Sequence, residues 1–163
     1  MKKQIIMRII KLLFISIGLL FGANVHAQKT PATVKTQKFK APKLFTHLGN
    51  VTDSVVTLIE AEAENIIALP LKIVDDKKNE YTVSSYQFLY NRRVVTEDEQ
   101  SGKVTPTSSI ASSRFTSTPL PQLWVNQVRE QLKSGEYIYF FDVIAKDAQG
   151  RVMYASTLKI MVK

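Results

Sequence analysis

Alternating polar and apolar positions predict β-structure in the middle of the chain. From Tyr81 to Tyr90, polar residues alternate with β-branched and aromatic ones, the pattern of a strand whose successive side chains point to opposite faces. Neither face of this segment is purely apolar. Arg92–Val95 keeps the same character and is expected to extend the strand.

A second alternating region predicts a hairpin at the end of the chain. Residues 136–146 and 151–163 are strand-like, and Asp147-Ala148-Gln149-Gly150 between them suits a type I turn followed by a left-handed glycine. The first strand is apolar on both sides from Tyr137 to Ile144, which is typical of a central strand covered on both faces. One face of the second strand is expected to hold Val152, Tyr154, Leu158, Ile160 and Val162.

The apolar spacing changes to a helical period before this hairpin. Pro121 suits a first helical turn, and Lys133-Ser134-Gly135 supplies a basic last turn and a glycine for the C-terminal cap. We therefore predict a helix whose apolar side consists of Leu123, Val125, Val128 and Leu132.

Two segments are less clearly patterned. Residues 53–64 fit a short capped helix, with Val55, Ile59 and Ala63 on one face, but their alternation also fits a strand. Ile66–Val74 is apolar and β-branched, and Pro70 within it favours an edge strand with a bend.

Residues 96–118 carry little apolar periodicity. Eleven of these 23 residues are Ser or Thr, so we predict a long surface loop, with at most a short strand around Ile110, Arg114 and Phe115.

The N-terminus has the three parts of a secretory signal. Four basic residues precede the apolar run Leu12–Ala23, and Val25-His26-Ala27 supplies small or short residues before a cleavage point. The run is too short to cross a membrane, since twelve residues of helix span only about 18 Å. We expect cleavage after Ala27, export to the periplasm or envelope, and no stable membrane insertion of the product.

The formal net charge of +8 comes from the N-terminal part of the chain rather than from the predicted domain. Four of the 22 basic residues belong to the signal, and five more lie in residues 28–46, a Pro-containing segment expected to be a flexible arm. Residues 47–163 hold the remaining 13 basic residues against 14 acidic ones, and we predict that they form one nearly neutral domain. A basic patch for nucleic acid is therefore not expected.

The residue inventory argues against an enzyme. The chain has no cysteine, and the only histidine after cleavage is His47, which excludes the usual zinc ligand sets and gives no nucleophilic triad. Glycine-rich phosphate loops are also absent, so no cofactor is expected. Asp142, which interrupts an apolar strand, is expected to form a structural ion pair with Arg151.

Binding by exposed aromatic side chains is the remaining chemistry that the sequence offers. Tyr137, Tyr139 and Phe141 share one side of the predicted strand and would form either part of the core or a stripe for a partner. Arg114 and Phe115 are further candidates for partner binding.

From Ile66 to Lys163 the chain resembles the C-terminal domain of the gliding-motility protein family GldM. The resemblance lies in the order of four motifs: Tyr81–Phe88, the segment from Leu132-Lys133-Ser134-Gly135 to Ala145, the turn Asp147–Arg151, and Ser156–Ile160. Gln149 departs modestly from the family's turn.

The resemblance implies a mainly β fold, an immunoglobulin-like β-sandwich with one or two short helices. It further implies a stand-alone periplasmic module that binds envelope or periplasmic proteins, an association with type IX secretion or gliding, and a homodimer. It brings no catalytic residue. The alternative hypothesis is a small-ligand or glycan-binding module that uses the Ser/Thr-rich segment and the Tyr137 and Tyr139 rings.

Overall fold

The computed structural model describes residues 39–163, so the predicted signal peptide and residues 28–38 of the predicted arm lie outside the described residues. Eight strands and two short helices make up this part of the chain. In chain order they are β1 Leu44–Leu48, β2 Val55–Leu58, α2 Glu60–Ile66, β3 Leu71–Asp75, β4 Glu80–Glu97, β5 Val104–Phe115, α3 Gln122–Gln131, β6 Tyr137–Lys146, β7 Val152–Tyr154 and β8 Leu158–Val162.

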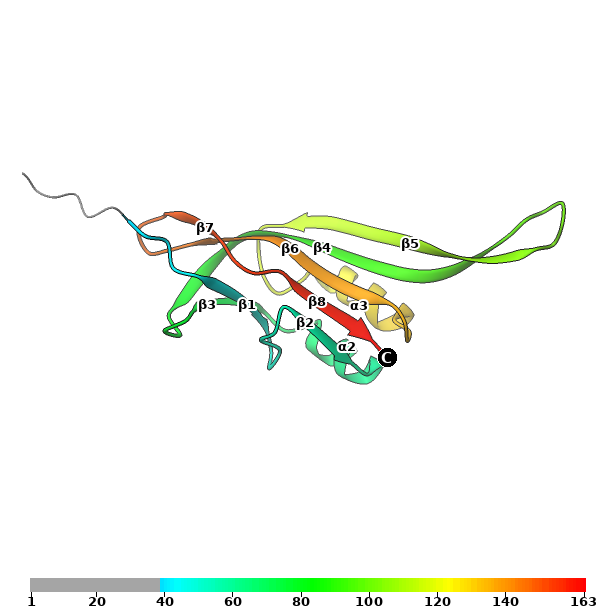
Figure 1. The fold of residues 1–163 in the computed structure, drawn as a ribbon, viewed down its shortest axis with the longest axis horizontal. Helices are drawn as coiled ribbons and strands as arrows, with labels where there is room; N and C mark the ends of the chain where they lie inside the picture. Colours follow the sequence, from blue (N-terminus) through cyan, green and yellow to red (C-terminus); the bar gives the residue numbers. More distant parts are fainter. Residues whose placement is uncertain (1–38) are drawn as a thin grey trace, which may run out of the picture. The chain divides into compact units, whose positions relative to one another are not determined.

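All eight strands belong to one mixed sheet that curls into a half-barrel (Figure 1). The strand order is β1-β3-β4-β6-β8-β2, with β5 paired to β4 and β7 paired to β6. Of these strand pairs only β2 with β8 is parallel. The curl brings β1 back to the segment between β7 and β8, where the Thr46 amide donates a hydrogen bond of 3.0 Å to Ser156 Oγ.

A mainly β fold with two short helices is therefore confirmed, whereas two sheets facing each other are not seen among the described residues. The reason lies in β4, which is 18 residues long. Its first residues pair with β3, and from Thr82 onward it pairs with β6. One strand thus joins both halves into a continuous sheet, and the helices rather than a second sheet cover its inner face.

The core lies between this inner face and the helices. Val125 and Val128 of α3 are buried, and Trp124 packs edge-on against Phe88 and Phe115, with ring centroids 5.6 Å apart in both pairs. The strands contribute alternate side chains to the same core, among them Leu44, Leu48, Ile73, Tyr86, Tyr90, Ile138, Phe140, Leu158 and Ile160.

The boundaries of the strands and the helix before β4 differ from those that we predicted. Strand β1 includes the last residues of the predicted arm, because Leu44, Thr46 and Leu48 point into the core. Residues 53–64, which fitted either a helix or a strand, form strand β2 first and then the start of helix α2. The strand expected within Ile66–Val74 is β3, which begins directly after Pro70. It pairs with β1 on one side and β4 on the other, so the prediction of an edge position is wrong.

The prediction of a loop at residues 96–118 is wrong. Strand β5 fills most of it and pairs with β4 in continuous register from Tyr86–Phe115 to Glu97–Val104. This two-stranded ribbon extends away from the helices (Figure 1). Its side chains there are exposed on both faces, so no apolar alternation reveals the strand. Thr has a high β propensity and Ser is compatible with strand pairing, so the composition does not oppose the strand.

The predicted hairpin around 147–150 is confirmed, but its second half is interrupted. A break at residues 155–157 separates β7 from β8 and reverses which side faces the core. As a result Met153 is buried while Val152 and Tyr154 are exposed, so these two do not share the face of the buried Leu158 and Ile160 as we predicted. The helix expected over 123–132 is confirmed as α3, and Val125, Val128 and Leu132 are buried as predicted. Leu123 is exposed instead, because Trp124 packs on the core rings. The helix ends at Gln131, so Gly135 does not cap it as we predicted.

Candidate functional site

The predicted aromatic stripe lies on the outer face of the sheet, on β6. Tyr137, Tyr139 and Phe141 are half-buried, and the residues between them, Ile138 and Phe140, point into the core. Strand β6 is central, as predicted, with β4 and β8 on either side, but within residues 39–163 no second layer lies over its outer face. The prediction that both faces are covered is therefore wrong.

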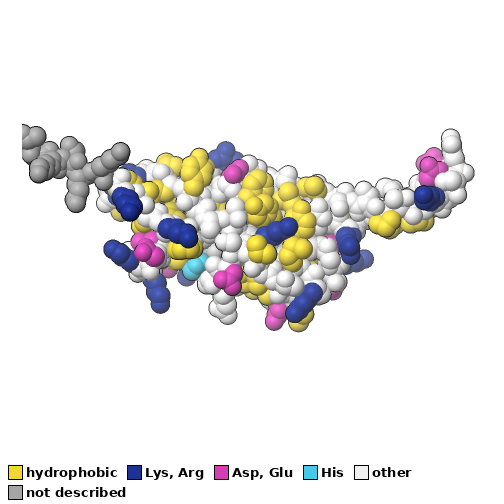
Figure 2. Space-filling view, viewed as in Figure 1, with side chains coloured by type: hydrophobic (Ala, Val, Ile, Leu, Met, Phe, Trp, Pro, Cys, Tyr) yellow, Lys and Arg dark blue, Asp and Glu magenta, His cyan; other side chains and the backbone are white. Residues whose placement is uncertain are grey.

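Hydrophobic side chains gather in the middle of one face of the domain, over β6 and β8 (Figure 2). Strand register places Leu89 of β4 on one side of Tyr139 and Lys159 of β8 on the other. Met161 of β8 lies beside Tyr137. The outer face is thus apolar at its centre, and a cation lies within it.

The aromatic rings are held in fixed contacts. Tyr139 and Phe141 stack with their planes 15° apart and their centroids 5.1 Å apart. Lys159 Nζ lies 4.0 Å from the centroid of the Tyr137 ring, a cation–π contact. Since the three side chains already contact one another or Lys159, they form a rigid surface that loses little side-chain entropy on binding.

The structure places Arg114 and Phe115 on opposite sides of β5. Arg114 is exposed on the outer face in the same row as Gln87 and Phe141, and its Nη2 donates a hydrogen bond of 2.9 Å to Ser85 Oγ. Phe115 packs inward, 5.8 Å from the ring of Tyr86. Only Arg114 of this predicted pair is therefore available at the outer surface with the stripe.

Asp142 lies at a β-bulge rather than in a buried ion pair. The register of β4 with β6 shifts between Ser85 and Gln87, so that β6 has one more residue than β4 at this point. Asp142 is exposed, its backbone has a φ of 46°, and its carboxylate accepts a hydrogen bond of 2.9 Å from Gln87 Nε2. Asp tolerates this left-handed conformation better than an aliphatic residue does.

Arg151, the residue predicted to pair with Asp142, forms its salt bridge with Asp147 across the β6–β7 turn. Desolvation tends to raise the pKa of Asp147, but hydrogen bonds from Arg151 and from the Gln149 amide keep the pKa below its usual value. The structure thus gives Asp142 and Arg151 different partners, and both interactions stabilise turns or strand irregularities.

A buried carboxylate that sequence reasoning missed joins α3 to β4. Glu136 is 1% exposed and accepts three hydrogen bonds, 2.6 Å from the Tyr90 hydroxyl, 2.8 Å from the Arg93 amide and 3.0 Å from the Lys133 amide. Burial, together with the bond to Glu136, raises the pKa of Tyr90. Glu is seldom buried without partners, and the sequence signal for this site was only its position in the short connection between α3 and β6.

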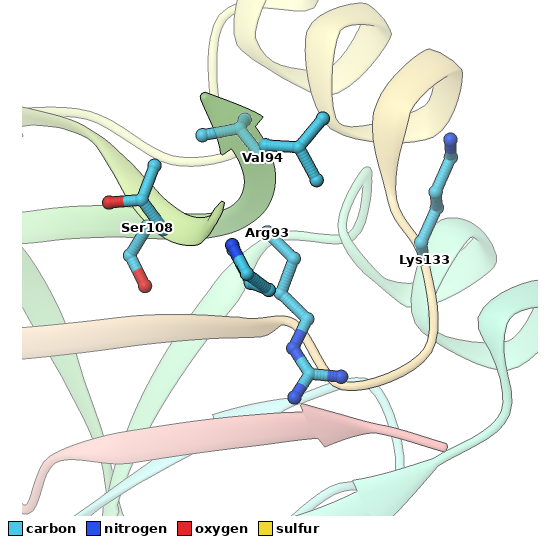
Figure 3. A pocket seen from close by; sticks show the side chains of 7 residues that line it. Arg93, Val94, Ser108 and Lys133 are labelled. Atoms are coloured by element: carbon cyan, nitrogen blue, oxygen red, sulfur yellow. The ribbon is translucent and has the colours of Figure 1, made fainter. Parts of the chain in front are cut away.

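A groove opens where the β4–β5 ribbon leaves the body, close to the end of α3 (Figure 3). It has a volume of about 700 Å³, and its lining includes Arg93, Val94, Ser108 and Lys133. The side chains of Arg93 and Lys133 point in different directions (Figure 3), so the two cations do not converge on one ligand position.

The part of the chain that the structure describes offers no further chemical centre. Within residues 39–163, no group of three or more His, Asp or Glu side chains is arranged to hold a metal ion. Over the same residues, no helix has the length and apolar character needed to cross a membrane. No protein-family model and no curated protein matches the chain.

Proposed function

We propose that this protein is an exported, non-enzymatic module that binds an envelope or periplasmic protein through the outer face of its sheet. The observation that carries the proposal is the uncovered aromatic stripe Tyr137–Tyr139–Phe141 in the middle of the curled sheet. Aromatic residues set in an apolar patch with a polar rim are characteristic of protein-binding surfaces. The signal-peptide pattern supports export.

The ring contacts favour a protein over a glycan. A sugar that stacks on an aromatic platform needs a free ring face, and the Tyr139–Phe141 stack and the Lys159 contact already occupy one face of each of the three rings. A protein partner can instead pack against ring edges and the neighbouring Leu89. Arg114 at the rim would add an electrostatic contact.

Membership of the GldM C-terminal family and a link to type IX secretion or gliding belong to the same proposal. The supporting feature is the order of the motifs, which fall on β4, on the end of α3 with β6, and on the hairpin of β6 with β7 and β8. An immunoglobulin-like sandwich is part of this resemblance, and an experimental structure in which the curled sheet separates into two facing sheets would support it.

The test is site-specific photo-crosslinking in the envelope of the source organism. A photoreactive phenylalanine analogue at Tyr139 should capture a defined protein, and Leu123, 76% exposed on α3, is the matched control position. Combined Tyr139→Ala and Phe141→Ala substitutions should weaken binding of the captured protein by ~10-fold or more, as expected for central aromatic residues. Equal capture at both positions, or unchanged affinity, would contradict the proposal.

A further inference from the structure

Strand β5 has an open edge. Among the described strands it pairs only with β4, so one row of its backbone groups has no strand beside it. An unpaired edge of twelve residues is long for a stable protein, because such an edge can pair with another chain.

The hydrogen-bond pattern shows which residues point outward. The Asp98 amide donates to the Lys103 carbonyl at 3.0 Å, which fixes the alternation of paired and unpaired groups down the ribbon. The Arg93 amide donates to Glu136 instead of β5, as this alternation requires. The residues of β5 that direct their N–H and C=O away from β4 are therefore Val104, Pro106, Ser108, Ile110, Ser112 and Arg114.

This edge lacks most of the features that prevent strand pairing. No side chain from Val104 to Ser113 is charged, and Arg114 is the first charged residue in the strand. Pro106 is the exception, because its missing N–H lies on the outward side and ends the stretch that can pair. The pairable segment is thus Ser108–Arg114, which lies beside the body of the domain.

We propose that the β5 edge pairs with the β5 edge of a second copy of this chain, in antiparallel orientation about a twofold axis. Apart from Arg114 at its end, this edge is uncharged, so it meets little repulsion from an identical edge and offers little charge that would select a different partner. Ile110 is 60% exposed in the middle of this segment, and a twofold axis beside it brings two such side chains together.

A register centred on Ala111 uses the whole pairable segment and excludes Pro106. Ser108 then lies opposite Arg114 of the second copy, and Ile110 lies opposite Ser112, so that the two Ile110 side chains are diagonal neighbours on the outer face. Each of the four outward residues can donate one N–H and accept at one C=O. The two sheets become one, with both aromatic stripes on the same side, so a repeated partner could be bound by both.

Sedimentation of the purified exported chain over a range of concentrations tests the proposal. The protein should form a dimer, and Ile110→Lys should raise the dissociation constant by ~10-fold or more, because a charge on the edge opposes pairing. The matched control is Val55→Lys, at a valine 62% exposed on the opposite edge strand β2, and it should leave the dimer intact. A monomer at every concentration, or equal effects of the two substitutions, would overturn the proposal.

Disulfide crosslinking supplies a second, independent readout. The chain has no cysteine, so Ala111→Cys introduces the only thiol, and in the proposed register the two Cys side chains face each other across the axis. Mild oxidation should give a covalent dimer from this variant but not from Ser101→Cys at the tip of the ribbon. Crosslinking that is no faster at residue 111 than at residue 101 would rule out the pairing, whatever the outcome of the binding experiments on the aromatic stripe.

Discussion

At the scale of single residues, the best-connected polar group is the Glu136 carboxylate. It satisfies two backbone amides at the end of α3 and on β4 together with the hydroxyl of Tyr90. All three donors point at one buried carboxylate, so its loss would leave several buried polar groups without partners. The position therefore contributes to stability far more than an exposed glutamate would.

We predict that Glu136→Gln destabilises the domain by about 1–3 kcal/mol, because an amide NH₂ would face donors where a carboxylate oxygen now accepts. Urea unfolding followed by circular dichroism measures the change. Glu130→Gln, at an exposed residue near the end of α3, is the control and should change stability by less than about 0.5 kcal/mol. Similar values for the two variants would show that the buried carboxylate has no special role.

At the scale of elements, the bulge in β6 decides which residues reach the outer face. The extra residue at Asp142 lets Phe140 and Val143 both face the core, although three positions separate them. Without the bulge, the stripe at Tyr139 and Phe141 could not coexist with a buried Val143 and Ala145 on the same strand.

Two explanations for an Asp at position 142 can be distinguished: its backbone conformation at the bulge, and the ion pair that we expected from the sequence. Asp142→Asn should change stability by less than about 0.5 kcal/mol, since Asn tolerates positive φ and keeps an acceptor for Gln87. Asp142→Val should cost about 1–2 kcal/mol, because a β-branched side chain is strained in this conformation. Equal losses in thermal or urea unfolding would mean that the charge, and not the backbone, matters here.

Helices and strands that pack an apolar face on the core could be predicted from the sequence. A strand that is held only by backbone pairing with its neighbour could not. The 3.6-residue spacing in 123–132 and the alternation in 81–90 reflect faces that pack on the core. Strand β5 could not be recognised from its own sequence pattern, because among the described strands it pairs only with β4 and its first residues are exposed on both faces. The single curled sheet was not predicted for a related reason, since local patterning does not show that β4 continues from one half of the sheet to the other.

Only the part of the candidate site that depends on local sequence pattern could be predicted. The stripe at Tyr137, Tyr139 and Phe141 follows from the two-residue period of a strand. Whether that face is covered depends on the path of distant strands, which the period does not encode. Phe115 and the acceptor role of Glu136 depend on contacts with segments that are far away in the sequence.

At the scale of the whole molecule, three turns that join antiparallel strands have the same feature: an aspartate whose carboxylate accepts hydrogen bonds from residues that follow it in the turn. Asp75 lies at the β3–β4 turn, Asp98 at the tip of the ribbon and Asp147 at the β6–β7 turn. A side-chain bond from Asn79 is the main cause that keeps the pKa of Asp75 below its usual 3.8. A bond from Ser101 does the same for the pKa of Asp98.

These shifts predict how stability depends on pH. A carboxyl whose pKa is lower in the folded state than in the unfolded chain stabilises the fold above pH 3.8, and the stabilisation is lost as the pH falls through the lower, folded-state value. The melting temperature should therefore be nearly constant from about pH 7 to about pH 5 and fall steeply below about pH 4. Asp75→Asn should lower the melting temperature at pH 7 and flatten the acid dependence. Asp76→Asn, at the exposed neighbouring residue, should leave the profile unchanged, and identical profiles for the two variants would contradict the proposed role of the Asp75 turn.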